Sequence, residues 1–389
     1  MTGLADAARH LGIPDGAFKL FLAGDVMTGR GVDQILPHPS EPRLYEPWVR
    51  SALTYVELAE KCNGPIARPV DFSYVWGDAL RPLQRERPAV RIVNLETAVT
   101  SSNDAWPGKG IHYRMHPANA TVLNSAAIDC CALANNHVLD WGHAGLRETL
   151  QTLHRHDVQT AGAGSDAAAA AAPAVFEVGL RRRVLVYAFG TDDSGVAQGF
   201  SATDTRAGVN RLPDLSARTV TAVAQSVHRA RRIGDSVIAS IHWGDNWGYA
   251  VPAAQRAFAH QLIDAGAADL VHGHSSHHAK GIEVYRGRLV LYGCGDFLND
   301  YEGIGGHEEY RPELATMYFP TLGADGRLLD LTLVPLRMRR LRLETATRDE
   351  GAWLLAMFNR ESAQFDSRFE SAPQGRLVWT GGKRSGRVS

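Results

Sequence analysis

The stretch Val271–Gly281 reads Val-His-Gly-His-Ser-Ser-His-His-Ala-Lys-Gly and holds four of the sixteen histidines of the chain. A short apolar run, Ala268–Val271 with Asp269 inside it, precedes the histidines, and small residues separate them. This pattern is typical of a strand that ends in a tight loop and presents imidazole nitrogens outward. Neutral imidazole is the commonest protein ligand of divalent transition metals, so the stretch indicates a metal site. A polar loop that is rich in histidine by chance is the alternative, and matching ligands at other strand ends decide between the two.

Four further apolar runs are predicted to be strands, and each is followed by a side chain of a kind that binds metals or moves protons. Layered α/β folds form their sites in the crevice outside the carboxyl ends of the strands. Asp25 alone is also explained as a helix N-cap, but a series of such residues in consecutive strands indicates one shared site. The runs are Lys19–Ala23, Val90–Asn94, Ile128–Ala134 and Ser236–Ile241. Together with the histidine-rich stretch, they bring Asp25, Glu96, Asn136, His137, His242, His274 and His277 to strand ends.

The ligand types narrow the choice of metal. The four cysteines show no Cys-x-x-Cys spacing, which argues against a thiolate zinc site and a disulfide framework and favours a reducing compartment. Carboxylate, amide and imidazole ligands fit one or two divalent ions of manganese, zinc or iron. Two ions about 3.5–4 Å apart, bridged by a carboxylate and a hydroxide, are the common hydrolytic arrangement. Such ions lower the pKa of bound water to about 7, so hydroxide is present at neutral pH.

Length and composition limit the class of protein. The 389 residues are 44% apolar and 21% charged, which suits one large α/β domain or two smaller ones. The formal net charge of −1 gives no global attraction to nucleic acid or to anionic membrane. Residues 1–16 carry scattered charges and no apolar segment of a signal peptide, and no run of eighteen apolar residues occurs. We therefore expect a soluble, cytoplasmic protein without a membrane span, and leave its oligomeric state, including a homo-oligomer, open.

Two parts of the chain differ in composition from the rest. Residues 36–87 are rich in proline and aromatic residues and are interpreted as a long, lid-like excursion over the sheet; a cover for apolar surface explains them equally well. Near the C-terminus a helix is predicted at Asp349–Phe358, and a Gly/Ser/Arg-rich tail from Gly375 is expected to be disordered. The predicted divisions are an N-terminal extension at 1–16, a main domain at 17–345 and a C-terminal part at 346–389.

Basic residues in two predicted loops are candidate contacts to an anionic substrate. Arg30 lies in a Gly-Arg-Gly turn shortly after Asp25, and Lys109 and Arg114 lie in the loop Ser101–Met115. A solvated surface charge is the simpler interpretation of Lys109 or Arg114 taken alone.

Six sequence motifs follow one another along the chain. They are Gly24-Asp25-Val-Met-x-Gly-Arg, Asn94-Leu-Glu96, Ala134-Asn-Asn-His137-x-x-Asp140-x-Gly142, His242-Trp-Gly244, Gly273-His274-x-x-His277 and Tyr292-x-x-Gly295-Asp296-Phe297. This set resembles the CapA family of poly-γ-glutamate capsule synthesis proteins, which are related to the calcineurin-like metallophosphoesterases. The match runs from about Leu20 to Phe319. The resemblance implies a metallophosphatase-like four-layer α/β/β/α sandwich, in which two mixed sheets face each other and helices cover the outside.

The resemblance also implies roles for individual residues. Asp25 and Glu96 resemble the carboxylates that hold and bridge the metals, and Asn136 resembles the amide ligand. His137 resembles the histidine that donates a proton to the leaving group, and with Asn136 and Asp140 it makes up the expected catalytic set. The imidazole ligands in this resemblance are His242, His274 and His277.

Some positions depart from the family pattern. The phosphoesterase motif begins Asp-x-His, but Met27 stands where the histidine would be. Gly-His-x-His is stretched to Gly-His-x-x-His, with Ser275 and Ser276 in place of the usual second histidine and proline of the CapA loop. The usual Asn after the late glycine is Asp296, which becomes a candidate replacement ligand or substrate contact. One metal site has therefore lost a ligand, and occupancy by a single metal, or by none, has to be considered.

The leading hypothesis is a soluble, metal-dependent hydrolase of the CapA family, and in particular a phosphoesterase. Metal-bound hydroxide would attack the phosphorus and His137 would protonate the leaving oxygen. The substrate would be a small or polymeric anion. The residues predicted to contact it are Arg30, Lys109, Arg114 and Asp296.

Other hypotheses use the same residues differently. A second hydrolytic version cleaves an amide or peptide bond, with poly-γ-glutamate as one candidate substrate. The rival class is a component of poly-γ-glutamate biosynthesis, or a polymer-binding protein, without hydrolytic activity. Capsule proteins of that kind usually carry an N-terminal membrane anchor, and its absence from this sequence weakens a capsule role. Met27 also suggests a degenerate phosphatase fold kept for binding alone, whereas His137 speaks for catalysis.

Overall fold

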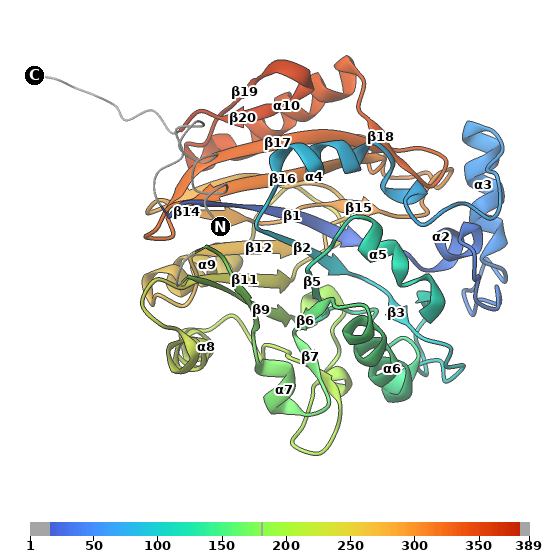
Figure 1. Cartoon of the computed structure of the whole chain (residues 1–389), viewed down its shortest axis with the longest axis horizontal. Helices are drawn as coiled ribbons and strands as arrows, with labels where there is room; N and C mark the ends of the chain where they lie inside the picture. Colours follow the sequence, from blue (N-terminus) through green and yellow to red (C-terminus); the bar gives the residue numbers. More distant parts are fainter. Residues whose placement is uncertain (1–15, 180–181, 382–389) are drawn as a thin grey trace, which may run out of the picture.

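Two β-sheets lie face to face between helical layers in the computed structural model, which describes residues 16–179 and 182–381 (Figure 1). Within these residues the first sheet has ten strands and the second has six. Both sheets are mixed, since β1 is parallel to β2 but antiparallel to β16, and β11 is parallel to β12 while β8 is antiparallel to β9. The predicted α/β class and the sandwich of two facing mixed sheets are confirmed.

The first sheet runs in the order β19-β20-β17-β16-β1-β2-β5-β6, with β15 paired to β1 and β18 paired to β17. Its strands are β1 (Phe18–Val26), β2 (Val90–Leu95), β5 (Cys130–Ala132), β6 (Gln159–Ala161), β15 (Asp296–Leu298), β16 (Leu314–Leu322), β17 (Leu328–Met338), β18 (Leu343–Thr345), β19 (Phe369–Ser371) and β20 (Leu377–Trp379).

The second sheet runs in the order β13-β14-β12-β11-β9-β8. Its strands are β8 (Ala174–Glu177), β9 (Arg183–Gly190), β11 (Ser236–His242), β12 (Leu270–His274), β13 (Ile282–Tyr285) and β14 (Arg288–Leu291). Two short pairs complete the strands: β3 (Ala98–Val99) with β4 (Arg114–Met115), and β7 (Ala163–Gly164) with β10 (Gly208–Val209).

Helices cover the outer faces of both sheets. Figure 1 shows α8 and α9 beside the second sheet, and α4 and α10 beside the first. The α-helices are α2 (Arg30–Ile35), α3 (Leu53–Asn63), α4 (Leu80–Glu86), α5 (Thr121–Ser125), α6 (Gly142–Arg155), α7 (Ala167–Ala171), α8 (Ala217–Ala230), α9 (Ala253–Asp264) and α10 (Arg348–Ser362).

The alternation of side chains along the strands of the second sheet separates two hydrophobic cores. Ile238 and Leu270 belong to the core between the two sheets, whereas Val237 and Val271 pack with the apolar faces of α8 and α9. Because successive strand residues point to opposite faces, every second residue of β11 and β12 faces the first sheet. His242, His272 and His274 have this parity, so their imidazoles face the space between the sheets.

Part of the excursion at 36–87 packs against the main hydrophobic core. Trp76 is buried, its ring lies 6.1 Å from that of Phe297, and its indole N–H donates to the carbonyl of Val122 at 2.7 Å. From there the chain continues into α4, which lies over the first sheet (Figure 1).

The C-terminal part differs from the expected disordered tail. The predicted helix is present as α10, but after Gly375 the chain forms β20, which pairs with both β17 and β19. The strand is stabilised by its partners in the sheet, because Leu377 is buried against the main core. The predicted N-terminal extension, apart from Gly16, and the last eight residues of the tail, 382–389, lie outside the described residues.

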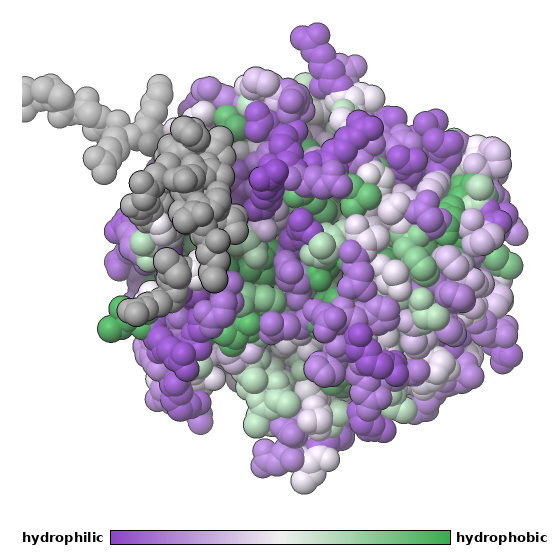
Figure 2. Space-filling view, viewed as in Figure 1, coloured by the Kyte–Doolittle hydropathy of each residue, from purple (hydrophilic) through white to green (hydrophobic). Residues whose placement is uncertain are grey.

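The surface in the view of Figure 2 carries hydrophilic side chains over most of its area, with hydrophobic ones in small separate groups. Among the helices of the described ranges, none has the length and apolar character that crossing a bilayer requires.

A substitution at Gly24 tests how tightly β1 fits against its neighbours. A Cβ added to Gly24 would lie 1.9 Å from the carbonyl oxygen of Gly295, which also accepts the N–H of Asp25 at 3.1 Å. We expect Gly24→Ala to lower the free energy of unfolding by about 1–3 kcal/mol or more, because backbone has to move. Urea denaturation followed by circular dichroism measures this change.

Gly351→Ala is the matched control, since a Cβ at Gly351 in α10 meets no atom within 4 Å. Alanine is the better helix former, so the control should keep or raise the stability by up to about 1 kcal/mol. Equal midpoints for Gly24→Ala and the wild-type protein would contradict the close approach of β1 to Gly295.

Candidate metal centre

The site is built at the carboxyl ends of strands from both sheets. β1 and β2 deliver Asp25 and Glu96, and β11 and β12 deliver His242 and His274. His272 links the two sheets close to the site, because its Nε2 lies 2.9 Å from the carbonyl oxygen of Ala23 on β1. His272 is thus used in the packing of the sheets and does not point into the site.

The first cluster consists of Asp25, His242 and His274, whose ligand atoms all lie within 4.8 Å of one another. The two Nδ1 atoms of the histidines are 2.9 Å apart, and that of His274 is 3.9 Å from Asp25. Ser240 orients the His274 ring through its Nε2, at 2.9 Å. Burial lowers the pKa of both histidines well below the ordinary value, so both are neutral and present lone pairs.

The second cluster consists of Asp25, His277 and Asp296, so the two clusters share Asp25. His277 Nδ1 lies 2.9 Å from Asp296 Oδ1, and Asn299 donates to the other oxygen of Asp296 at 2.9 Å. Asp296 reaches this position because β15 pairs with β1 and places it directly opposite Asp25. Asp296 was predicted as a replacement ligand or a substrate contact, and it lies in a cluster that could hold an ion.

Met27 and Ser275 show how the chain accommodates its departures from the family pattern. Met27 is buried, and its sulfur lies 3.7 Å from the hydroxyl of Tyr301. Ser275 has a φ of 99°, a conformation that a residue with a side chain adopts at a cost of about 1–3 kcal/mol. In that conformation the N–H of Ser275 donates to Asp25 at 3.2 Å. The strained turn therefore helps to fix the shared carboxylate.

Glu96 lies beside the first cluster. Glu96 Oε1 lies 3.9 Å from His242 Nε2, and Asn94 donates to both Asp25, at 2.7 Å, and Glu96, at 3.1 Å. Asn94 was not singled out from the sequence, although it directly precedes the Leu-Glu of its motif. It holds the two carboxylates next to each other.

The electrostatics of the site favour a divalent cation. Burial, together with the charge of Asp296, raises the pKa of Asp25 to about 7, and burial and the charge of Asp25 raise the pKa of Glu96. The side-chain oxygen of Asn136 is buried and has no hydrogen-bond partner among the described residues. Buried carboxylates, neutral imidazoles and an unpaired amide oxygen are the ligands that manganese, zinc and iron bind. The residues present therefore fit the predicted metal.

His137 lies at the edge of this centre, with Nε2 3.8 Å from Glu96 Oε1. Asp140 is fully buried and accepts at 2.7 Å from the Nδ1 side of His137, which leaves Nε2 free toward the cavity. Lys109 contacts Asp140 and the carbonyl of Asn136, and its Nζ lies 3.2 Å from His137 Nδ1. Asp140 thus positions His137, and Lys109 reaches the site from a distant loop.

The two arginines predicted to contact substrate do not line the cavity beside the centre, although the guanidinium of Arg30 lies 4.6 Å from the ring of Tyr113, which does. Arg30 is buried, pairs with Asp300 and Glu46, and lies over the ring of Tyr55 at 3.8 Å. Arg114 donates to the backbone carbonyls of Ser102 and Glu41 and to the side chain of Asn103. Their predicted role as substrate contacts has no support in this geometry and remains untested.

The cavity beside the centre has a volume of about 340 Å³. No residue of 36–87, a segment that is described in full, lines it, and the lid-like role predicted for that segment stays a prediction. Tyr113 and Tyr301 were not predicted, and nothing local in the sequence marks them. Their hydroxyl groups are 3.1 Å apart. The lining comprises Glu96, Lys109, Gly110, Ile111, Tyr113, Asn136, His137, His242, Asn246, Ser275, His277 and Tyr301.

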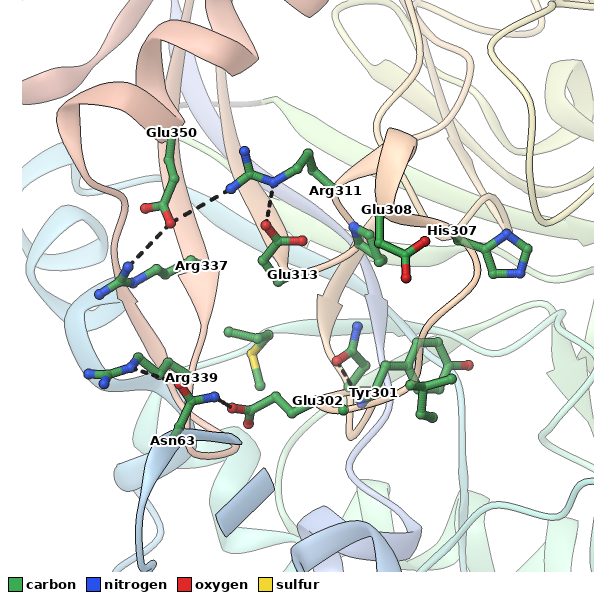
Figure 3. Close-up of a pocket in the computed structure, with 15 residues that line it drawn as sticks. Asn63, Tyr301, Glu302, His307, Glu308, Arg311, Glu313, Arg337, Arg339 and Glu350 are labelled. Carbon is green, nitrogen blue, oxygen red and sulfur yellow. Dashed lines mark hydrogen bonds and ion pairs between the residues drawn. The ribbon is translucent and has the colours of Figure 1, made fainter. Parts of the chain in front are cut away.

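A second cavity, of about 430 Å³, shares Tyr301 with the first and is shown in Figure 3. Its arginines are already paired. Arg311 pairs with Glu313, and Arg337 lies 3.2 Å from Glu350. The third, Arg339, donates to the side chain of Asn63 at 3.0 Å (Figure 3). We therefore assign no anion to this cavity.

The fold and the two clusters define a class of protein: a layered α/β protein with a candidate centre for one or two divalent metal ions. The chain belongs to the family of bacterial capsule synthesis proteins termed PGA_cap, whose model matches residues 19–301. The resemblance to the CapA family is thereby confirmed.

Named relatives agree with this assignment. A probable polyglutamine synthesis accessory protein of Mycobacterium tuberculosis is 46% identical, over 94% of this chain and 96% of its own. The PGA biosynthesis protein CapA of Bacillus subtilis is 27% identical, over 77% and 68% of the two chains. Among solved structures, a 5'-nucleotidase precursor of Thermus thermophilus is 14% identical with a TM-score of 0.42, over 88% of this chain and 58% of its own.

Metal content tests the two clusters separately. After incubation with manganese or zinc and desalting, we expect the wild-type protein to retain about two ions per chain. His242→Ala removes a ligand from the first cluster and Asp296→Ala removes one from the second, so each should retain about one. Asp25→Ala should lose both, because Asp25 is shared. Elemental analysis of the desalted proteins gives the count.

His154→Ala is the control, since His154 is exposed on α6 and belongs to neither cluster. A wild-type protein that retains no metal would contradict the assignment of the centre. Loss of both ions from Asp296→Ala would contradict the independence of the second cluster.

Proposed function

We propose that this CapA-family protein is a metal-dependent hydrolase that acts on a small or polymeric anionic substrate, with a phosphoester as the bond cleaved. The observation that carries this proposal is the placement of His137. Its Nδ1 is held by a buried carboxylate, and its Nε2 faces a cavity that both ligand clusters border. A protein that only binds a polymer has no need of an imidazole oriented in this way.

The metal and the chain supply different parts of the chemistry. Bound divalent ions supply a nucleophile at neutral pH and stabilise negative charge on the substrate. Asn94 and Ser275 fix the carboxylate of Asp25, and Ser240 fixes the ring of His274, so the ligands are oriented in advance. His137 is the group that can move a proton to the leaving oxygen.

The protonation of His137 depends on the substrate. Burial lowers the pKa of His137 to about 4, Asp140 acts against this lowering, and Lys109 adds to it. His137 is therefore neutral at pH 7 without a ligand. An anionic substrate next to Nε2 adds negative charge, which raises the pKa and favours the protonated form that a general acid needs. This argument favours an anionic substrate over a neutral one.

A second candidate function has its support in the relatives. Proteins named for polyglutamine synthesis and for PGA biosynthesis match this chain over most of its length. In this alternative the chain takes part in the biosynthesis of a glutamate polymer, or binds that polymer, without cleaving a phosphoester. In a hydrolytic version of this alternative, the protein cleaves an amide bond in such a polymer.

Turnover of p-nitrophenyl phosphate and bis-p-nitrophenyl phosphate tests the proposal. With manganese or zinc present, we expect measurable turnover that EDTA abolishes. His137→Gln should lower kcat by about 10²–10⁴-fold, the usual contribution of general acid catalysis. Metal content should stay unchanged in this variant, because His137 is in neither cluster.

Asp140→Asn distinguishes positioning from a structural role. Removal of this carboxylate, which acts to raise the pKa of His137, should lower that pKa further. The upper limb of the pH–kcat profile should therefore move to lower pH, in addition to a fall in kcat of about tenfold or more. His154→Gln is the control for both variants. Bound metal without turnover of either phosphoester, together with release of glutamate from poly-γ-glutamate, would replace the phosphoesterase by the amide hydrolase. Bound metal without either activity would favour the accessory role.

A further inference from the structure

A cavity of about 530 Å³ lies on the other side of the second sheet from the candidate metal centre, between β9 and α8. Its floor includes Tyr187 and Phe189 of β9, whose rings are nearly parallel, at 6°, with centroids 6.4 Å apart. Ala222 and Ser226 of α8 line it with small side chains, which leaves room above the rings. The volume falls in the range of about 300–1,000 Å³ that is usual for small-molecule sites.

Positive charge borders this cavity. Arg211, Arg218 and Arg229 line it, and Arg211 pairs with Asp192 at 2.9 Å. Within the part of the chain that the structure describes, Arg218 and Arg229 form no ion pair or side-chain hydrogen bond. The carboxylate in the lining, Asp214, is used at the start of α8, where it accepts from the N–H of Ser216 at 2.9 Å and from the hydroxyl of Thr219. Two guanidinium groups are therefore available to an anion.

The buried hydroxyl of Tyr187 is a second indication that this cavity binds a molecule. Tyr187 is only 2% exposed, and its hydroxyl has no hydrogen-bond partner among the described residues. Buried hydroxyl groups are nearly always hydrogen-bonded, so one without a partner in the floor of a cavity calls for an explanation. The ring of Tyr187 lines the cavity, so a small shift of this side chain would bring its hydroxyl to a polar atom of a bound molecule.

We propose that this cavity is a second binding site, for a small anion that carries a planar aromatic body. The aromatic body packs on Tyr187 and Phe189, and the anionic group is bound by Arg218 or by Arg229, which stand about 16 Å apart along α8 and whose guanidinium groups suit carboxylate, sulfonate or phosphate. This site is separate from the metal centre, and the proposal holds whether or not the chain is a hydrolase.

The fluorescent probe 8-anilinonaphthalene-1-sulfonate has this chemistry and is added to the full chain. We expect saturable binding to one site. Ala222→Phe fills the space above the floor and should weaken binding at least about tenfold, and Arg218→Ala combined with Arg229→Ala should weaken it by about fivefold or more. Gln225→Phe is the matched control, since Gln225 is exposed on α8 and does not line the cavity. It should bind like the wild-type protein.

His242→Ala separates this site from the metal centre and should leave the affinity for the probe unchanged. The double arginine variant changes exposed side chains only, so it remains informative if Ala222→Phe does not fold. The proposal is overturned if the wild-type protein does not bind the probe at up to about 1 mM, the range of weak binding. It is also overturned if the double arginine variant binds like the wild-type protein, or if Gln225→Phe weakens binding as much as Ala222→Phe.

Discussion

The burial of three carboxylates at one point is the constraint on which the rest of the structure depends. Asp25, Glu96 and Asp296 are 0%, 2% and 3% exposed, and each lies within reach of the charge of another. An ion taken out of water without compensation costs several kcal/mol. Arg30 pairs with Asp300 and Glu46, and Lys109 pairs with Asp140, so these two cations are used elsewhere. His277 pairs with Asp296, and the charges of Asp296 and Asp25 raise the pKa of this histidine against the effect of burial. A bound divalent cation would compensate this charge, and the fold holds the carboxylates close enough together to share one.

The pairing of backbone strands keeps these carboxylates in place. β1 is paired with β2 on one side and with both β15 and β16 on the other, so Asp25 has little freedom to move away from its neighbours. The close approach of Gly24 to Gly295 allows β15 to place Asp296 opposite Asp25. Across the site, the parallel pairing of β11 with β12 sets His242 directly beside His274. Carboxylates from one sheet and imidazoles from the other thus meet only because the two sheets pack face to face.

The geometry of the candidate metal centre suggests a physical reason for the departures from the phosphoesterase pattern. Met27 provides no nitrogen ligand, and Asp296 brings a carboxylate to the same cluster, bonded to His277. The second cluster therefore holds two carboxylates and one imidazole, a set that favours a harder cation than the first cluster does. His137, Asp140 and Lys109 form a network beside the two candidate ligand clusters and not among their residues, so a change in this network need not remove a bound metal. A family member that has lost turnover could keep the metal.

The sequence by itself determined the class of fold, most of the elements and most residues of the centre. It could do so because apolar runs mark strands locally, and because the residue after such a run lies at the end of the sheet where sites form. Asp25, Glu96, His137, His242 and His274 are all placed by that rule. The tertiary structure decided what depends on contacts between distant segments. It paired Asp296 with His277, brought Lys109 to Asp140, left Arg30 and Arg114 outside the lining of the cavity, and made a strand of Leu377–Trp379. It also formed the cavity between β9 and α8. No local periodicity encodes such contacts, because each is stabilised only when a partner far away in the chain has already been brought beside it.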